Sequence, residues 1–139
     1  MIRAIFISLV LVFPTYAGEL QTNNFRVFLW KFFNDPKFQL EHVQFPLKYS
    51  YYEAGFFDIE EKAKTLTLEN WNNLPGPEHF RCKVNCFDLM IYDNFDKTHQ
   101  NTDKRVLSFE GVENGILINL YFEYKASEWM LIRWEDYSG

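Results

Sequence analysis

DPKFQLEHVQFPLKYSYY, residues 35–52, decides the fold, because a helical stretch ends in it and a long strand begins in it. From residue 43 onward the odd positions are all apolar or aromatic: Val43, Phe45, Leu47, Tyr49 and Tyr51. Side chains of a strand alternate between its two faces, so this spacing predicts a strand with one apolar and one wetter face. Pro46 has no N–H to donate, which predicts that it lies at a sheet edge or a bulge.

Upstream of this strand the sequence predicts two helices. One helix face follows the i, i+3, i+4, i+7 spacing, with Phe25, Phe28, Leu29 and Phe32. Thr22, Asn23 or Asn24 can cap its start, and we expect residues 18–21 to be a loose lead. Asp35 and Pro36 then end this helix and begin a short helical turn over residues 37–41.

Downstream, the sequence predicts a β-meander. Residues 56–64 fit a helix or a loop, residues 67–71 a short capped helix, and residues 72–77, NNLPGP, a turn. We expect strands over residues 84–92, 105–112, 116–124 and 129–134. Asn114-Gly115 predicts a tight hairpin, because both residues tolerate positive φ. Helices followed by a meander indicate an α+β fold, with N-terminal helices packed on a curved, cone-like antiparallel sheet.

Length, composition and charge limit the classes of function. The 139 residues suit a single domain, and 47% hydrophobic residues argue against disorder. Aromatic residues make up 19% of the chain. Their side chains either form the core, which is the interpretation that we favour, or line a cleft. A formal net charge of −5 without a basic patch argues against nucleic acid or anionic lipid as a partner.

Residues 1–17 have the pattern of a secretory signal peptide, which leaves residues 18–139 as the single domain. Arg3 supplies the positive start, residues 4–13 the apolar run, and Thr15 and Ala17 the small residues before cleavage at Gly18. The run is shorter than the roughly 20 residues that a membrane-spanning helix needs. The residue directly after the cleavage site is Gly18 and not a lipid-accepting cysteine, so we expect a periplasmic or secreted protein without a membrane anchor.

The two cysteines, Cys82 and Cys86, are predicted to form a disulfide in an oxidising compartment. In a straight strand their Cα atoms would lie about 13 Å apart. A disulfide needs less than about 7 Å, so the bond requires a bend over residues 83–85. His79 and the two cysteines also fit a metal site, but no fourth ligand is evident, and we expect no metal or cofactor.

No pattern predicts catalysis. The chain has no G-x-S-x-G motif and no cysteine–histidine pair in a defined context. His42 and His99 are expected to be solvated. The candidate ligand-binding residues are the aromatic side chains expected on a concave sheet face: Tyr49, Tyr51, Trp71, Tyr121 and Trp129.

Two segments carry a resemblance to a known family. Residues 32–39, FFNDPKFQ, followed by residues 43–47, VQFPL, resemble the signature of domain of unknown function 4348. Residues 129–133, WMLIR, resemble the last strand of the NTF2-like, cystatin-like group. The resemblance implies a bent sheet around a helix. It implies no known activity, so no catalytic residue can be assigned through it.

Three classes of function are compatible with these observations. The first is a non-enzymatic exported binding domain whose cleft holds an apolar or sugar-like ligand, or a peptide. The second is a periplasmic inhibitor or immunity protein against a toxin, which small size, export and acidic charge would suit. The third is a small hydrolase or isomerase with its active site in the cone, since such folds host many chemistries.

Overall fold

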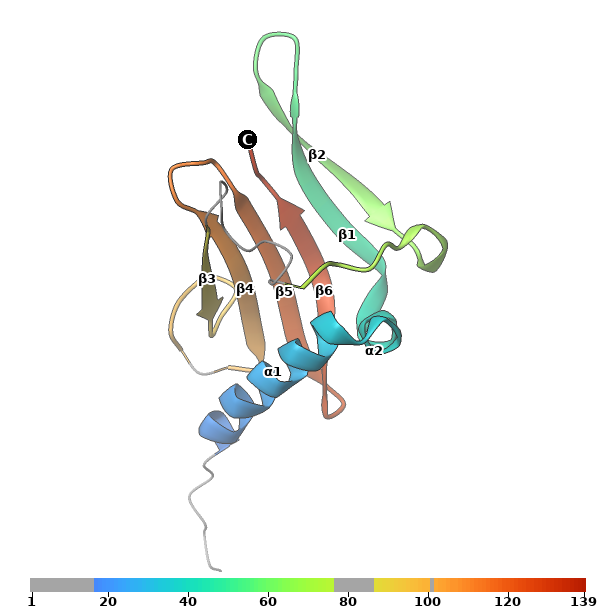
Figure 1. The fold of residues 1–139 in the computed structure, drawn as a ribbon, viewed down its shortest axis with the longest axis vertical. Coiled ribbons are helices and arrows are strands. Elements are labelled where there is room, and N and C mark those ends of the chain that lie inside the picture. Colours follow the sequence, from blue (N-terminus) through green and yellow to red (C-terminus); the bar gives the residue numbers. More distant parts are fainter. Residues whose placement is uncertain (1–16, 77–86, 101) are drawn as a thin grey trace, which may run out of the picture.

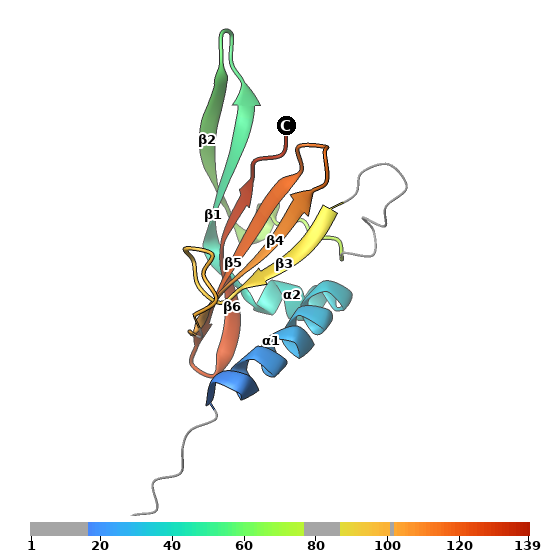
Figure 2. The same ribbon diagram turned by 90° about the vertical axis from the view of Figure 1, so that its left-hand side faces the viewer.

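The computed structural model describes residues 17–76, 87–100 and 102–139, with side chains from Asn24 onward. Within these ranges the helices lie on one face of a six-stranded sheet (Figures 1 and 2). The helices are α1 (Ala17–Asn34), α2 (Pro36–Glu41) and the 3-10 helix η1 (Leu68–Asn70). The strands are β1 (Val43–Ala54), β2 (Ile59–Leu66), β3 (Phe87–Tyr92), β4 (Lys104–Gly111), β5 (Leu117–Lys125) and β6 (Glu128–Asp136).

The sheet is mixed, with the strand order β2-β1-β6-β5-β4-β3. Every neighbouring pair is antiparallel except β1 and β6, which run parallel. The predicted α+β class and the meander are confirmed, whereas the purely antiparallel sheet is wrong at this one pair. The cause is the connection through η1. Strand β2 lies at one edge of the sheet, and the next strand in the sequence, β3, lies at the other edge. The meander of β3, β4, β5 and β6 therefore returns toward β1 and ends with β6 beside it.

Strand β1 extends the predicted strand and contains the predicted irregularity at Pro46. Its register against β6 shifts between Val43 and Lys48, and Pro46 lies within that interval, as expected of a bulge. From Leu47 onward β1 pairs with β2, so residues 59–64, predicted as helix or loop, form a strand, while residues 56–58 lie in the turn before it. The β1–β2 hairpin projects beyond the other strands (Figure 1), and in its turn Phe56 and Phe57 are 92% and 94% exposed.

Helix α1 begins earlier than predicted. The expected loose lead over residues 18–21 is helical, because Glu19, Leu20 and Gln21 favour helix and no proline interrupts them. The predicted start of α2 is confirmed. The Asp35 carboxylate accepts hydrogen bonds from the backbone N–H groups of Lys37 and Phe38, at 3.1 and 3.0 Å.

The core forms where α1 packs against the middle of the sheet. The predicted helix face, Phe25, Phe28, Leu29 and Phe32, is buried. Phe122 of β5 lies among these side chains, with ring centroids 5.4 Å from Phe25, 5.6 Å from Phe28 and 5.4 Å from Phe32.

His42, predicted to be solvated, is instead 9% exposed. It comes directly after α2 rather than continuing the wet face of β1, and its ring stacks on Phe38 at 3.8 Å between centroids. The other predicted solvated histidine, His99, is exposed in the loop between β3 and β4.

The hairpins of the meander agree only in part with the turn chemistry of the sequence. Gly115 has φ of 70°, as predicted for the turn between β4 and β5, but the other residue of this turn with positive φ is Glu113, at 58°, and not Asn114. The connection spans residues 112–116, so it is longer than the predicted tight turn.

Strands β5 and β6 pair Phe122 with Leu131 but Tyr121 with Arg133. Ile132 is therefore an extra residue in β6. It places the side chains of residues 133–136 on the sheet faces opposite to those that uninterrupted alternation would give.

Three sequence predictions fall outside the described residues. The predicted signal peptide, residues 1–17, lies within the undescribed residues 1–16 except for Ala17, and Cys82, Cys86 and His79 lie within the undescribed residues 77–86. The disulfide and the bend over residues 83–85 therefore stay predictions. Among the described helices, none has the length and apolar character to cross a membrane.

Candidate ligand-binding cavity

A cavity of about 280 Å³ lies on the helix side of the sheet. Its floor is formed by β4, β5 and β6, one side by the end of α1, and another by the segment after η1. The lining residues are Phe33, Asn72, Asn73, Leu74, Pro75, Phe109, Ile118, Leu120, Trp134 and Asp136. Most of these side chains are apolar, so the cavity suits an apolar group better than bulk water.

Gln39 of α2 fixes the segment that walls the cavity. Its side chain is 1% exposed. Its amide nitrogen donates to the carbonyl oxygens of Phe32 and Leu74 at 3.0 and 3.1 Å, and its amide oxygen accepts from Leu74 N–H at 2.6 Å. The Phe32 carbonyl would normally accept from the residue four positions later, but Pro36 has no N–H. Gln39 therefore supplies the missing donor and holds Leu74 against the helices.

Polar side chains interrupt the apolar wall at three of the described lining residues, Asn72, Asn73 and Asp136. The indole N–H of Trp134 is buried and has no hydrogen-bond partner among the described residues. Asp136 is the one charged side chain among the described residues that line the cavity. The wall thus offers two neutral amides and one anionic acceptor, whereas the indole N–H is enclosed by the protein itself.

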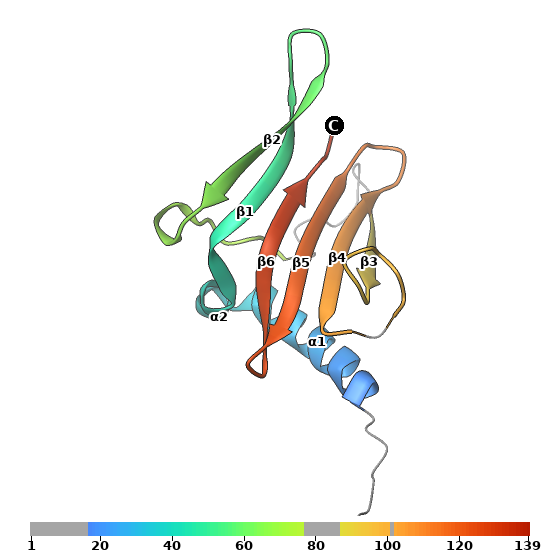
Figure 3. The same ribbon diagram turned by 180° about the vertical axis from the view of Figure 1, so that it is seen from behind.

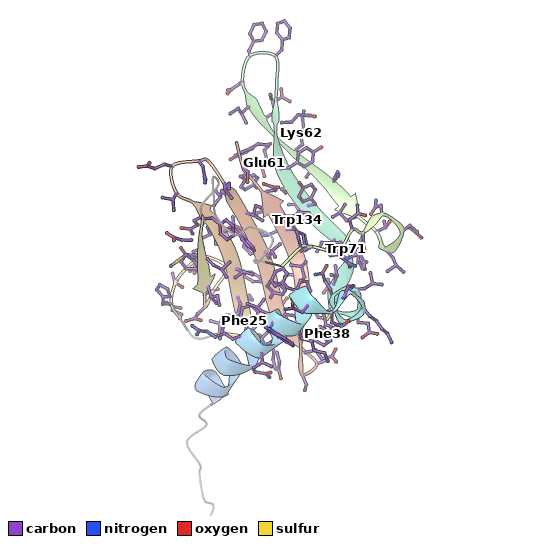
Figure 4. All side chains as sticks on the ribbon, in the orientation of Figure 1. Phe25, Phe38, Glu61, Lys62, Trp71 and Trp134 are labelled. Atoms are coloured by element: carbon purple, nitrogen blue, oxygen red, sulfur yellow. The ribbon has the colours of Figure 1, made fainter. Side chains whose placement is uncertain are left out.

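Two of the predicted ligand-binding residues, Tyr49 and Trp71, contact Trp134 of the cavity wall, and a third, Tyr51, stacks on Tyr49. Trp71 and Trp134 are labelled in Figure 4. The ring centroids of Tyr49 and Trp71 lie 4.4 and 6.4 Å from Trp134, and Tyr51 stacks on Tyr49 at 5.3 Å. Burial, with a further contribution from the Asp136 charge, raises the pKa of Tyr49. These residues support the wall without lining it, and their role in ligand binding stays a prediction.

The structure separates Tyr121 from the other predicted residues. It lies on the sheet face opposite the helices, the face seen in Figure 3. Its hydroxyl donates to a Glu135 carboxylate oxygen at 2.7 Å, and the Arg133 guanidinium lies 3.7 Å from its ring centroid. Burial, together with the hydrogen bond to Glu135, raises the pKa of Tyr121 to about 12.

Trp129 is also placed away from the cavity, inside the core. It is 2% exposed and packs on Phe25 and Tyr124, with ring centroids 4.7 and 5.1 Å away. The five predicted residues therefore do not form one surface. Three gather beside Trp134, one lies behind the sheet, and one lies under α1.

Comparison with known protein families identifies the relatives of this chain. The family model described as domain of unknown function (DUF4348) matches residues 14–136, which is most of the chain. The chain belongs to this family. The resemblance seen in residues 32–39 and 43–47 is thereby confirmed, and no curated protein matches the sequence.

The fold of this DUF4348 chain is similar to solved NTF2-like structures. An NTF2-like protein from Bacteroides fragilis matches at 25% identity and a TM-score of 0.51, over 78% of this chain and 44% of that one. The chain thus spans less than half of that protein's length. An NTF2-like protein of unknown function from Silicibacter pomeroyi matches at 10% identity and a TM-score of 0.39, over 88% of this chain and 98% of its own. A cystatin-like protein of unknown function from Nostoc punctiforme matches at 11% identity and 0.39, over 90% and 93%.

Sequence reasoning missed most of the cavity residues of the DUF4348 chain. Trp134 and Asp136 were not singled out, because their face depends on the extra residue Ile132. The sequence predicts a turn over residues 72–77, but residues 72–76 form an irregular segment instead of a turn, and nothing in their sequence indicates that they wall a cavity. The available signal was Gln39, a polar side chain between the apolar Phe38 and Leu40 of a short helix.

Proposed function

We propose that this chain is a non-enzymatic domain that binds a small, mostly apolar ligand in the cavity beside Trp134. The observation that carries the proposal is the composition of the wall. Of the ten lining residues within the described part of the chain, seven are apolar: Phe33, Leu74, Pro75, Phe109, Ile118, Leu120 and Trp134. Cavities of this character, with a few polar groups, are the usual sites for small ligands.

The cavity limits the size and the strength of what it binds. A volume of about 280 Å³ is at the lower end of the range for ligand sites, so one aromatic ring with a short substituent is a suitable probe. The polar side chains among the described lining residues are the amides of Asn72 and Asn73 and the carboxylate of Asp136, and these are the groups that a ligand hydroxyl would meet. For a ligand of this size we expect a Kd of about 0.1–1 mM.

Binding of 2-phenylethanol tests the proposal. We expect saturable binding, measured by chemical shifts in two-dimensional NMR, with the largest shifts at cavity residues such as Leu74 and Trp134. Substituting Ile118→Phe places a larger side chain in the cavity, and it should weaken binding by about tenfold or more.

The matched control is Ile59→Phe, the same substitution at a position that is 64% exposed on β2 and away from the cavity. It should bind 2-phenylethanol like the unsubstituted protein. Absence of binding at concentrations up to about 10 mM, or equal binding by both variants, would overturn the proposed site.

The proposed function includes export of the protein from the cell. Arg3 and the apolar run over residues 4–13 support an exported, periplasmic or secreted protein, which N-terminal sequencing of protein from its native host would test. A start at Met1 would contradict export.

The cone-like layout is supported by α1 and its buried phenylalanines on one face of the sheet. The alternatives of a toxin inhibitor and of a small hydrolase or isomerase are supported only by the sequence features that suggested them.

A further inference from the structure

The charge of the cavity wall bears on the class of ligand that the cavity takes. We propose that the cavity selects ligands with an aromatic body and an ammonium end, held by the Asp136 carboxylate, an inference that rests on the proposed function. Neutral and anionic ligands of the same shape are expected to bind less well. The chemical class is that of small arylalkylamines, and Asp136 is the residue that determines the preference.

Asp136 is placed on the cavity side by its neighbours in the sheet. It pairs with Ile118 of β5 and lies in register with Tyr51 of β1. One carboxylate oxygen accepts the backbone N–H of Ser138 at 3.2 Å. The second oxygen has no partner among the described residues, so it is available to a ligand donor.

No described cation neutralises Asp136. The ion pairs among the described residues involve other carboxylates. In the register of the sheet, Lys62 of β2 lies in the row of Tyr51 and Asp136, but its ammonium pairs with Glu60. The next lysine on β2, Lys64, lies over the rings of Tyr49 and Tyr51, with its ammonium nitrogen 5.3 and 5.5 Å from their centroids. A ligand carboxylate at this end of the cavity would meet an uncompensated like charge, which disfavours anionic ligands.

Asp136 and the amides of Asn72 and Asn73 prefer different ligand ends, and the hydrogen bonds that they form differ in strength. A neutral amide suits a neutral ligand group, such as a hydroxyl. The carboxylate suits a donor, and an ammonium makes a charge-assisted hydrogen bond with it that is about twice as strong as a neutral one. The net charge of −5 adds a weak general attraction for cations. Asp136 is therefore expected to decide the preference.

The aromatic part of the class is indicated by the other lining residues. Phe33, Phe109 and Trp134 come from α1, β4 and β6, so aromatic rings border the cavity from three elements. Aromatic pairs are favourable beyond the area that they bury. An aromatic ring on a two-carbon chain places its ring among these side chains and its end group at Asp136.

The experiment compares three probes of nearly equal size: 2-phenylethylamine, 2-phenylethanol and phenylacetate. Calorimetric titration at neutral pH should give the tightest binding for the amine, about five- to tenfold tighter than the alcohol, and the weakest for phenylacetate. The preference for the amine should shrink as salt is added, because exposed charges are screened.

The variant Asp136→Asn keeps the size of the side chain and its acceptor for Ser138 but removes the charge. We expect it to reduce the preference for the amine over the alcohol to about twofold or less, because the charge-assisted hydrogen bond to the ammonium is lost. The matched control is Asp58→Asn in the β1–β2 turn, which changes the net charge equally but should keep the preference.

The outcomes separate this inference from the proposed function. If the alcohol binds as tightly as the amine, or if Asp136→Asn keeps the preference, the ammonium class is wrong while the cavity remains a binding site. If none of the three probes binds, both the proposed function and the inference fail. Equal loss of preference in Asp58→Asn would show a general charge effect and would overturn the role of Asp136.

Discussion

Replacing Phe122 with alanine is expected to lower the free energy of unfolding by about 3–5 kcal/mol, the usual cost of emptying a buried phenylalanine site. Phe122 is fully buried. It contacts Phe25, Phe28 and Phe32, so its removal would leave the helix face without its central partner on β5. Because those rings come from a helix and Phe122 from a strand, the vacancy would loosen the joint between the two layers. Urea denaturation followed by circular dichroism measures the loss.

Phe56→Ala provides the matched control for this prediction. Phe56 is 92% exposed in the β1–β2 turn, so the same truncation there should change the free energy of unfolding by less than about 0.5 kcal/mol. If Phe122→Ala does not fold, Phe122→Leu keeps most of the apolar volume and should cost about 1–2 kcal/mol. A loss below about 1 kcal/mol for Phe122→Ala would mean that α1 does not pack as described.

Local patterns predicted those parts of the fold that depend on a few consecutive residues. The spacing of Phe25, Phe28, Leu29 and Phe32 predicted the buried helix face, and Asn114-Gly115 predicted the hairpin. Strand β2 was missed because its sequence, IEEKAKTL, contains helix-forming residues and little alternation. Its pairing with β1 overrides that local preference, which is common for edge strands.

The cavity could not be predicted because one extra residue decides which side chains form it. An uninterrupted β5–β6 ladder that pairs Phe122 with Leu131 would pair Leu120 with Arg133. The extra residue, Ile132, pairs Leu120 with Trp134 instead, so Trp134 and Asp136 lie on the helix side. A shift of one residue reverses the faces of a strand, and no feature of residues 128–136 marks the position of the bulge.

Gln39→Leu is expected to lower the free energy of unfolding by about 2–4 kcal/mol, because leucine leaves three backbone groups without their partners. These groups are the carbonyl oxygens of Phe32 and Leu74 and the N–H of Leu74. The variant should also weaken binding of 2-phenylethanol, because Leu74 is part of the cavity wall. Thermal unfolding and the NMR titration measure the two effects on the same protein.

Gln44→Leu is the matched control, since Gln44 is exposed on β1 and forms no part of the cavity wall. It should change neither the free energy of unfolding, within about 0.5 kcal/mol, nor the binding of 2-phenylethanol. Pro36 explains why the two glutamines should differ. It withholds a donor from the Phe32 carbonyl, so the chain depends on a side chain at position 39 to satisfy that oxygen and to bind Leu74. Equal effects of the two substitutions would contradict this dependence, and the cavity wall would then be held by the packing of Leu74 alone.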